Sequence, residues 1–442
     1  MNQLVEKNKS VIDNKPFYNS VIPKDWSTPE FGSIFSFLKS YSFSRNQLTS
    51  EKTDDAIRNI HYGDIHSTYQ NEILDLEVEK TIPYLLDGII NKDNFDDENF
   101  PSLCDGDLII ADASEDYEGV CDCVELNNVK DNKIVAGLHT FAARSDKDQV
   151  ALGFRTYILK HQQVIRELRR IATGTSVYGV SKTNLSKVII AIPPIPEQQA
   201  IAKLLSKSDA IIHSTEKLIA KKEHCKKWLV QQLLLGRKRL KGFDEEWKKQ
   251  RLGDLFNRVT RKNIEGNTNV VTISAQRGFV RQRDYFNKEV ASKVLDNYFL
   301  VQKGEFCYNK SYSNGYPKGA TKRLNDFDKA VVTTLYICFK INDVGKTSGD
   351  FFEQFFEANY LNRGLTRIAH EGGRAHGLLN VTPSDFFSLE ITIPSFEEQS
   401  AIAIVLQSAD KEIRLLKAKV DRLHAQKKGL MQQLLTGKIR VK

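Results

Sequence analysis

The feature that most constrains this chain is a long segment that occurs twice. Residues 192 to 238 and residues 393 to 439 align without a gap, and 18 of the 47 aligned positions are identical. Each copy begins with Ile-Pro, continues through Glu-Gln and Ile-Ala, and ends at Gln-Gln-Leu-Leu-x-Gly. A fixed internal period of this kind indicates a repeat architecture, so two similar units in tandem are expected.

Each copy carries the marks of one long helix. Glu197 and Glu398 lie near the start, where a negative charge suits the helix dipole, and Gly236 and Gly437 lie where glycine commonly ends a helix. At about 1.5 Å per residue, the roughly 38 residues between these signals would form a rod of about 57 Å. Both copies are therefore predicted to be much longer than an ordinary globular helix.

An apolar stripe with alternating spacings of three and four follows both predicted helices, and lysines interrupt it toward the end of each. This pattern predicts a coiled-coil seam between the two helices. The alternative is two separate amphipathic surface helices. The residues expected in the seam are Leu205, Ile212, Ile219, Leu229, Leu233, Leu406, Ile413, Leu416, Val420, Leu423, Leu430 and Leu434.

The repeat extends into the sequence that precedes each helix. Trp26, followed by a Phe-Gly pair at 31 and 32, matches Trp247, followed by a Leu-Gly pair at 252 and 253. Strand-like and helix-like segments mix within each half, which predicts α+β lobes. Tandem units tend to pack about a two-fold axis, so two pseudo-two-fold related lobes joined by long antiparallel helices are expected, with the helices as a coiled-coil spacer.

These signals divide the 442 residues into five parts. We expect an N-terminal extension at 1–20, a first globular domain at 21–194, a first long helix and hinge at 195–241, a second globular domain at 242–394 and a second long helix at 395–442.

Charge is distributed unevenly along the chain. Residues 1 to 196 carry 21 basic and 29 acidic side chains, whereas the remainder is basic enough to give the whole chain a net charge of +8. A basic second half indicates a polyanionic partner such as nucleic acid. The N-terminus lacks an apolar signal core and the six cysteines include no Cys-x-x-Cys pair, so a soluble, cytoplasmic protein with reduced thiols and no metal is expected.

Signatures of catalysis are weak. The chain has no Asn/Asp-Pro-Pro-Tyr/Phe motif of an amino-methyltransferase, and no glycine-rich nucleotide loop follows a strand. One Glu-x-Lys triplet, at Glu246 to Lys248, could hold a nuclease metal, but it lies in the hinge and has no counterpart near Trp26. A solvated linker is the better interpretation.

Polar, aromatic and basic loops at matching places in the two halves are candidates for nucleic-acid contacts. Aligning Gly106-Asp107 with Gly304-Glu305 brings Asp112 opposite Lys310. Lysine favours phosphates and the acceptor edge of guanine, whereas aspartate can accept from the cytosine amino group. The DNA-contact candidates are Asp112, Ser114, Tyr117, Arg144, Ser176, Tyr178, Lys310, Ser311, Tyr312, Ser313, Asn314, Lys318, Arg374 and His376.

Together, two variable halves that each end in the Ile-Pro, Glu-Gln, Ile-Ala and Gln-Gln-Leu-Leu-x-Gly pattern resemble the specificity subunit of type I restriction-modification enzymes. The resemblance covers the chain from about residue 20. It implies a non-catalytic reader of double-stranded DNA with two target-recognition domains, each binding one half of a split target. It also implies helices that dock two methyltransferase subunits, together with restriction and translocase subunits. S-adenosylmethionine, ATP and Mg²⁺ would be bound by those partners, and no cofactor by this chain.

Divergent loops on matched scaffolds indicate a target whose two halves differ, and so an asymmetric site. Two other functions stay open from the residues alone. The chain could be a stand-alone DNA endonuclease that uses the hinge triplet, or a protein-only scaffold whose basic helices bind an acidic partner. The acidic first half is unexpected for a DNA reader, because phosphate binding favours a basic surface.

Overall fold

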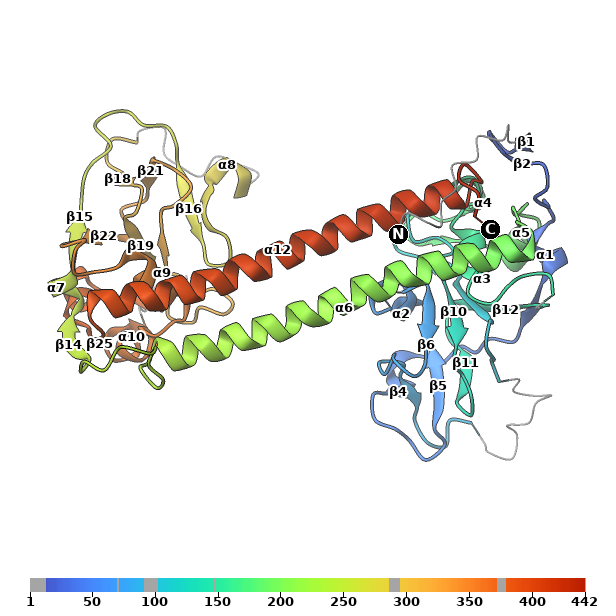
Figure 1. Ribbon diagram of the computed structural model, residues 1–442, viewed down its shortest axis with the longest axis horizontal. Coiled ribbons are helices and arrows are strands. Elements are labelled where there is room, and N and C mark those ends of the chain that lie inside the picture. The colour runs from blue at the N-terminus through green and yellow to red at the C-terminus, as the bar shows by residue number, and fades with distance from the viewer. Residues whose placement is uncertain are drawn as a thin grey trace. The chain divides into compact units, whose positions relative to one another are not determined.

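The computed structural model describes residues 13–69, 71–90, 102–146, 148–285, 295–371 and 379–441. The chain divides into two compact units: unit 1 comprises residues 1–216 and 418–442, and unit 2 comprises residues 217–417. Two long helices cross this division, α6 (Ile195–Leu233) and α12 (Phe396–Leu434), each of 39 residues (Figure 1). Each unit therefore contains one globular lobe and one half of each long helix.

Unit 1 combines short helices with mixed sheets. Its strands are β1 (Asn14–Phe17), β2 (Ser20–Pro23), β3 (Phe35–Leu38), β4 (Leu48–Thr49), β5 (Ile57–Ile60), β6 (Ile73–Asp75), β7 (Tyr84–Leu85), β8 (Leu108–Ala111), β9 (Ala113–Ser114), β10 (Cys123–Asn127), β11 (Lys133–Ala136), β12 (Thr140–Ser145) and β13 (Tyr178–Gly179). Its helices in the lobe are α1 (Phe31–Ile34), the 3-10 helix η1 (Arg45–Gln47), α2 (Tyr62–Ser67), α3 (Arg155–Leu159), α4 (Gln162–Ile171) and α5 (Lys182–Ser186).

Unit 2 has the same mixture. Its strands are β14 (Lys248–Arg251), β15 (Phe256–Val259), β16 (Val271–Ser274), β17 (Gly278–Arg281), β18 (Phe299–Gln302), β19 (Phe306–Asn309), β20 (Ala320–Arg323), β21 (Lys329–Val332), β22 (Ile337–Ile341), β23 (His370–Glu371), β24 (Leu379–Asn380) and β25 (Glu390–Ile393). Its helices in the lobe are α7 (Leu252–Leu255), α8 (Gln282–Tyr285), α9 (Gly349–Glu357), α10 (Asn362–Ile368) and α11 (Pro383–Ser388).

The principal sheets of the two lobes share one topology. In unit 1 the strand order is β3-β12-β8-β10-β6, and in unit 2 it is β15-β22-β19-β20. The first four strands pair antiparallel in both lobes, and β6 adds a parallel edge to β10 in unit 1. The predicted α+β class, with two domain repeats and the long helix α6 as spacer, is confirmed.

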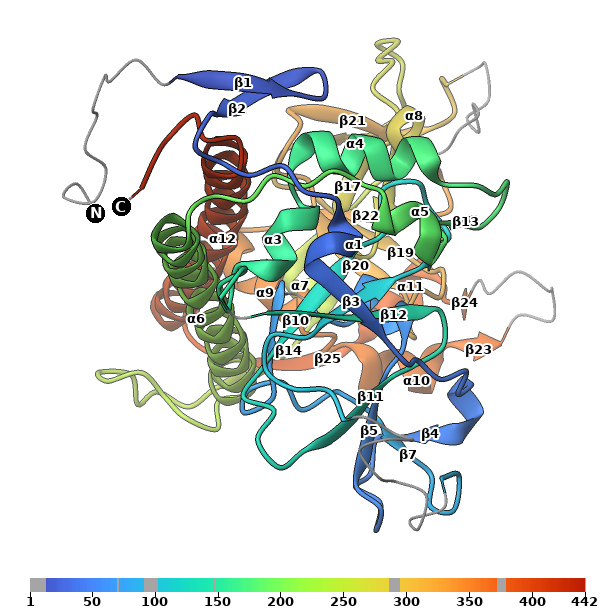
Figure 2. The same ribbon diagram turned by 90° about the vertical axis from the view of Figure 1, so that its right-hand side faces the viewer.

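The ends of the long helices belong to the hydrophobic cores of the lobes. In unit 1, Leu205 of α6 and Leu434 of α12 are buried in one cluster with Trp26 and with Tyr157 of α3. Figure 2 shows α6 and α12 side by side next to this part of the lobe. The helices are therefore held by burial of apolar side chains in a folded lobe as well as by each other.

The same polar contact fixes the helix ends in both units. In unit 1, the buried carboxylate of Glu197 accepts hydrogen bonds from Trp26 Nε1 at 3.0 Å and from Arg440 Nε at 2.7 Å. In unit 2, Glu398 accepts from Trp247 Nε1 at 3.1 Å and forms an ion pair with Arg239. Each contact joins the first turn of one long helix to the segment that follows the other.

The order of these contacts shows that the two helices run antiparallel within each unit. In unit 1 the partners of Glu197, Asp209 and Glu216 are Arg440, Lys427 and His424, in decreasing order. In unit 2 the contacts again descend, from Glu398 with Arg239 through Asp410 with Lys226 to Glu412 with Lys222.

Lys427, one of the predicted interruptions of the apolar stripe, is a buried ion-pair residue in unit 1. Its ammonium group contacts the carboxylates of Asp209 at 2.5 Å and of Glu72, and the three side chains are between 9% and 17% exposed. Lys226 pairs with Asp410 at the matching place in unit 2, where the two side chains are 29% and 41% exposed.

In the part of the chain that the structure describes, none of the helices could span a membrane.

We expect Lys427→Ala to lower the free energy of unfolding by about 3 kcal/mol, because it leaves two largely buried carboxylates without their cation. The matched change Lys226→Ala should cost less than about 1 kcal/mol, because its pair is more exposed to solvent. Urea denaturation of both variants measures the difference. Equal losses would show that burial does not distinguish the two ion pairs.

Candidate nucleic-acid interface

The predicted recognition loops follow equivalent strands of the two lobes. Residues 112–119 follow β8, and residues 310–319 connect β19 to β20. Before each strand a glycine adopts a left-handed φ, +88° at Gly106 and +87° at Gly304, where residues with a Cβ are disfavoured. The following acid closes the turn: Asp107 accepts from the Cys104 amide at 2.7 Å, and Glu305 from the Gln302 amide at 2.8 Å.

An arginine neutralises each turn carboxylate. Arg144, one of the predicted DNA contacts, donates to both oxygens of the fully buried Asp107 at 2.7 and 2.6 Å. This pair raises the pKa of Arg144. Arg261 pairs with Glu305 in the same way at 2.9 Å. The sequence alignment paired the two acids but did not show that Arg144 is the internal partner of Asp107. We propose a structural role for Arg144 in place of the DNA contact predicted from the sequence.

Asp112 lies in a cluster of aromatic and histidine side chains in unit 1. Its carboxylate is 3.2 Å from His139 Nδ1, and burial raises the pKa of Asp112 while His139 lowers it. The ring of His139 meets that of Tyr62 edge to face at 5.4 Å, and His66 Nε2 lies 3.1 Å from the carbonyl oxygen of Ala113. Sequence reasoning missed these three neighbours, although the run His61-Tyr62 with His66 was a visible signal.

The other candidates of the first lobe surround Asp112 to different depths. Ser114 is buried in β9 and pairs with Tyr178 of β13, so its hydroxyl is not at the surface. Tyr117 is 44% exposed; it stacks edge to face on Tyr178 at 5.2 Å and donates to the Arg169 carbonyl at 2.6 Å. Ser176 is exposed in the loop before β13.

In the second lobe the candidates from Lys310 to Lys318 share one hairpin loop. Tyr312 is 65% exposed, and Asn314 is also exposed. Lys310 is half-buried, which lowers its pKa, and no hydrogen bond or ion pair of its ammonium group occurs among the described residues. The loop also contains the half-buried Ser311, Ser313 and Lys318. Among the described residues, nothing competes for this ammonium group, so it is available to an anion or a base acceptor.

A second segment lies beside each loop. In unit 1 the amide of Val180 donates to the Asp112 carbonyl at 3.0 Å, and in unit 2 the amide of Leu379 donates to the Lys310 carbonyl at 3.1 Å. In the first lobe the structure thus brings together the two predicted loop regions, and in the second lobe it places Leu379 of β24 beside Lys310. Arg374 and His376, from the glycine-rich loop of the second lobe, lie outside the described residues.

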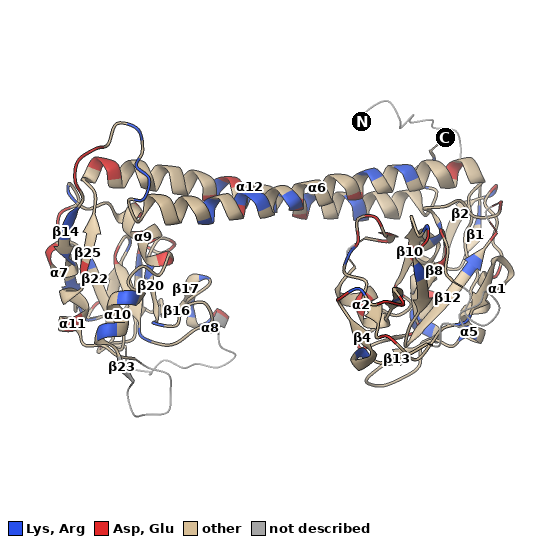
Figure 3. Cartoon of the chain, turned by 90° about the horizontal axis from the view of Figure 1, so that it is seen from below, with Lys and Arg blue, Asp and Glu red and all other residues tan. Residues whose placement is uncertain are grey.

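All the predicted seam residues are buried or half-buried. Leu205, Ile212, Leu233, Leu406, Ile413, Val420 and Leu434 are buried, and Ile219, Leu229, Leu416, Leu423 and Leu430 are half-buried. Which of them interlock as coiled-coil neighbours stays a prediction. Figure 3 shows basic residues, with fewer acidic ones among them, along the middle of the two helices.

The hinge triplet has a packing role. Trp247 is half-buried; its indole donates to Glu398, and the guanidinium of Arg239 lies 5.8 Å from its ring centre. Glu246 and Lys248 are exposed on either side.

In the described part of the chain, no three His, Cys, Asp or Glu side chains form a possible metal site. The buried Cys121 and Cys123 have pKa values raised to about 12 by burial, which disfavours reactive thiolates.

We expect Arg144→Ala to destabilise unit 1 by about 3 kcal/mol, because it leaves the buried Asp107 unpaired. The half-site preference of the folded protein should stay unchanged. The exposed Arg166→Ala is the matched control and should leave the melting temperature unchanged. A shift in the recognised DNA sequence by Arg144→Ala without a loss of stability would instead make Arg144 a base contact.

Comparison with known proteins agrees with this architecture over almost the whole chain. The model of the type I restriction modification DNA specificity domain matches residues 23–223 and 244–425. The chain is 26% identical to the putative type I restriction enzyme MjaX specificity subunit of Methanocaldococcus jannaschii, covering 95% of both chains. It is 22% identical to the MjaVIII specificity subunit of the same organism, covering 97% of this chain and 96% of that subunit.

Solved structures show the same fold at low identity. The S subunit of a type I system from M. genitalium superposes with a TM-score of 0.51 at 14% identity, covering 95% of this chain and 97% of that one. The HsdS subunit from Thermoanaerobacter tengcongensis gives 0.50 at 14% identity, covering 97% and 100%. Because the family model matches both lobes and most of both helices, this chain belongs to the type I restriction-modification specificity subunits, the non-catalytic DNA-recognition components of these systems.

Proposed function

We propose that the chain reads a split, asymmetric DNA target, with one half-site for the lobe at 21–194 and the other for the lobe at 242–394. The observation that carries this proposal is the pair Asp112 and Lys310. They occupy equivalent places after β8 and β19, on one shared turn and sheet topology, and carry opposite charge. Opposite charge at equivalent places favours different bases.

The chemistry of each loop supports this division. The second lobe offers Lys310 together with exposed amide and phenol groups, which suit phosphates and base acceptors. The first lobe offers Asp112 beside His139 and Tyr62, a set that accepts and donates hydrogen bonds without a net positive charge. We therefore assign cytosine- or adenine-type amino donors to the first lobe and guanine-type acceptors to the second.

Because the first lobe is acidic, other subunits are expected to provide some of the contacts to DNA phosphates. Of the arginines that could form a basic face, Arg144 pairs with Asp107, Arg170 pairs with Glu167, and Arg169 donates to the Glu118 carbonyl. Each of these three arginines therefore has an internal contact. We infer that methyltransferase subunits supply the remaining phosphate contacts.

The surfaces of the long helices support docking of those subunits. Apolar side chains point outward from both: Ile211 and Leu218 of α6 are 41% and 40% exposed, and Ile404 and Leu415 of α12 are 66% and 60% exposed. Exposed apolar side chains grouped on helices are typical of protein interfaces. In the proposed complex two methyltransferase subunits bind S-adenosylmethionine, restriction and translocase subunits bind ATP and Mg²⁺, and the assembly acts on DNA in the cytoplasm.

We expect Lys310→Ala to weaken or relax recognition of one half-site by about 1 to 3 kcal/mol, because it removes a contact to a base. The other half-site should be read as before. Sequencing of methylated bases in cells that express the chain with its methyltransferase measures both halves at once.

Lys303→Ala is the matched control, since Lys303 is exposed in the same lobe and its nearest carboxylate oxygen, on Asp328, is 3.9 Å away. An unchanged motif at unchanged occupancy in Lys310→Ala would remove this lysine from the reading surface. A palindromic motif in the wild type would overturn the asymmetry.

A further inference from the structure

We infer that Tyr316, Lys322 and Glu357 are positioning residues that hold the 310–319 loop of the second lobe in the conformation that reads bases. The inference rests on the proposed function, because it takes that loop as a reader. It adds residues that touch no DNA and that act by fixing the loop to α9. These residues would set the sequence preference of one half-site only.

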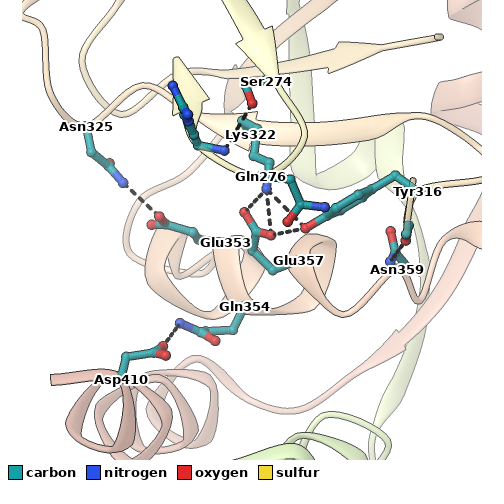
Figure 4. A network of polar contacts seen from close by, with 12 residues as sticks. Ser274, Gln276, Tyr316, Lys322, Asn325, Glu353, Gln354, Glu357, Asn359 and Asp410 are labelled. Atoms are coloured by element: carbon teal, nitrogen blue, oxygen red, sulfur yellow. Dashed lines mark hydrogen bonds and ion pairs between the residues drawn. The ribbon is translucent and has the colours of Figure 1, made fainter. Parts of the chain in front are cut away.

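The three side chains meet at one point in unit 2 (Figure 4). The Tyr316 hydroxyl donates to Glu357 Oε2 at 2.8 Å, and the ammonium group of Lys322 contacts the same oxygen at 2.6 Å. Lys322 also lies 4.8 Å from the centre of the Tyr316 ring, and only 6% of its side chain is exposed. A lysine this deeply buried requires its carboxylate partner, so the contact is a fixed part of the lobe.

Two amides hold the backbone of the same loop. Asn359 Nδ2 donates to the Gly315 carbonyl at 3.1 Å, and Gln276 Nε2 donates to the Asn314 carbonyl at 3.1 Å. With the Tyr316 hydroxyl, three consecutive loop residues are held from outside the loop. Tyr312, by contrast, is 65% exposed. Residues 314–316 of the loop are therefore held in place, while Tyr312 stays exposed to solvent.

The support behind the loop continues to the long helices. On α9, Glu353 accepts from Asn325 at 2.7 Å, and Gln354 donates to Asp410 of α12 at 3.0 Å. Asp410 in turn pairs with Lys226 of α6. One helix thus contacts both the reading loop and the helix pair of unit 2, so the orientation of the loop is tied to the rigid part of the unit.

The first lobe holds its loop differently. Its 112–119 loop is fixed by Tyr117, which donates to the Arg169 carbonyl of α4, and by Asp116, which accepts from the Gly119 amide at 2.7 Å. The two lobes have the same sheet topology, but the contacts that support the loop differ between them. Each support accompanies its own loop, as expected if it serves the half-site that this loop reads.

A loop that is ordered before binding should discriminate between bases better than a flexible loop. A loop that is already ordered loses less conformational entropy on binding, and its donors and acceptors stay within reach of one set of base edges. Loss of the support should therefore reduce discrimination between correct and incorrect bases more than it reduces general attraction to DNA.

The test uses the full chain expressed with its methyltransferase and compares methylation of duplexes that vary in one half-site at a time. The variant combines Tyr316→Phe, which removes one hydroxyl, with Asn359→Gly. Asn359 has a φ of +60°, so glycine fits its backbone conformation while the side-chain amide that holds Gly315 is removed. Asn325→Ala is the matched control, because it removes a contact to α9 that does not touch the loop. Melting temperatures are measured for each protein, and Tyr316→Phe alone serves if the double variant does not fold.

We expect the double variant to lose about tenfold in discrimination at the half-site of the second lobe, and the control less than twofold. Discrimination at the other half-site should stay at the wild-type value. If the double variant keeps full discrimination while Lys310→Ala loses it, the inference is overturned and the proposed function stands. If Lys310→Ala also keeps it, Lys310 is not on the reading surface, and the observation that carries the proposed function fails together with the inference. Equal losses at both half-sites would indicate general destabilisation and would also overturn the inference.

Discussion

Burial of the ends of two antiparallel helices in each lobe is the constraint on which the rest of this structure depends. A helix of 39 residues with charged side chains along much of its length has little to stabilise it as an isolated element. Here Leu205 and Leu434 are buried in the core of unit 1, and Leu406 and Leu233 in that of unit 2. The Trp-Glu-Arg contact then fixes each helix start against the segment after the other helix, so in each unit the helix ends are held by the lobe.

The same repeat separates what is constant from what varies. The left-handed glycine and the acid that closes its turn occur in both lobes, before equivalent strands of the two sheets. The arginine that pairs with the acid comes from a different place in each lobe, from β12 in unit 1 and from the segment after β15 in unit 2. The residues after these equivalent strands differ between the lobes: in unit 1 they continue into β9, which pairs with β13, and in unit 2 they form the 310–319 loop. Under the proposed function, such a scaffold lets the DNA target change while the fold is kept.

The sequence predicted the fold well because its strongest signals are local and occur twice. The helix starts near Glu197 and Glu398 and the stops before Gly236 and Gly437 depend on short-range chemistry, and the repeat made each a check on the other. The candidate site was less predictable. From the sequence, Ser114 was expected in a polar loop, but it is buried in a short strand. Arg144 was expected to contact DNA, but it pairs with Asp107. Such pairs join residues far apart in sequence, and periodicity carries no information on them.

By itself, then, the sequence determined the duplicated architecture, the two long helices, the equivalent loops and the family to which the chain is similar. Only the tertiary structure decided which polar residues are used internally and which stay available. Lys310 and Lys322 are both lysines near the same loop, but Lys322 is buried against Glu357 while no ion pair of Lys310 occurs among the described residues. The physical reason is that a buried charge must find a partner within hydrogen-bond distance, and the folding of α9 against β20 supplies one to Lys322.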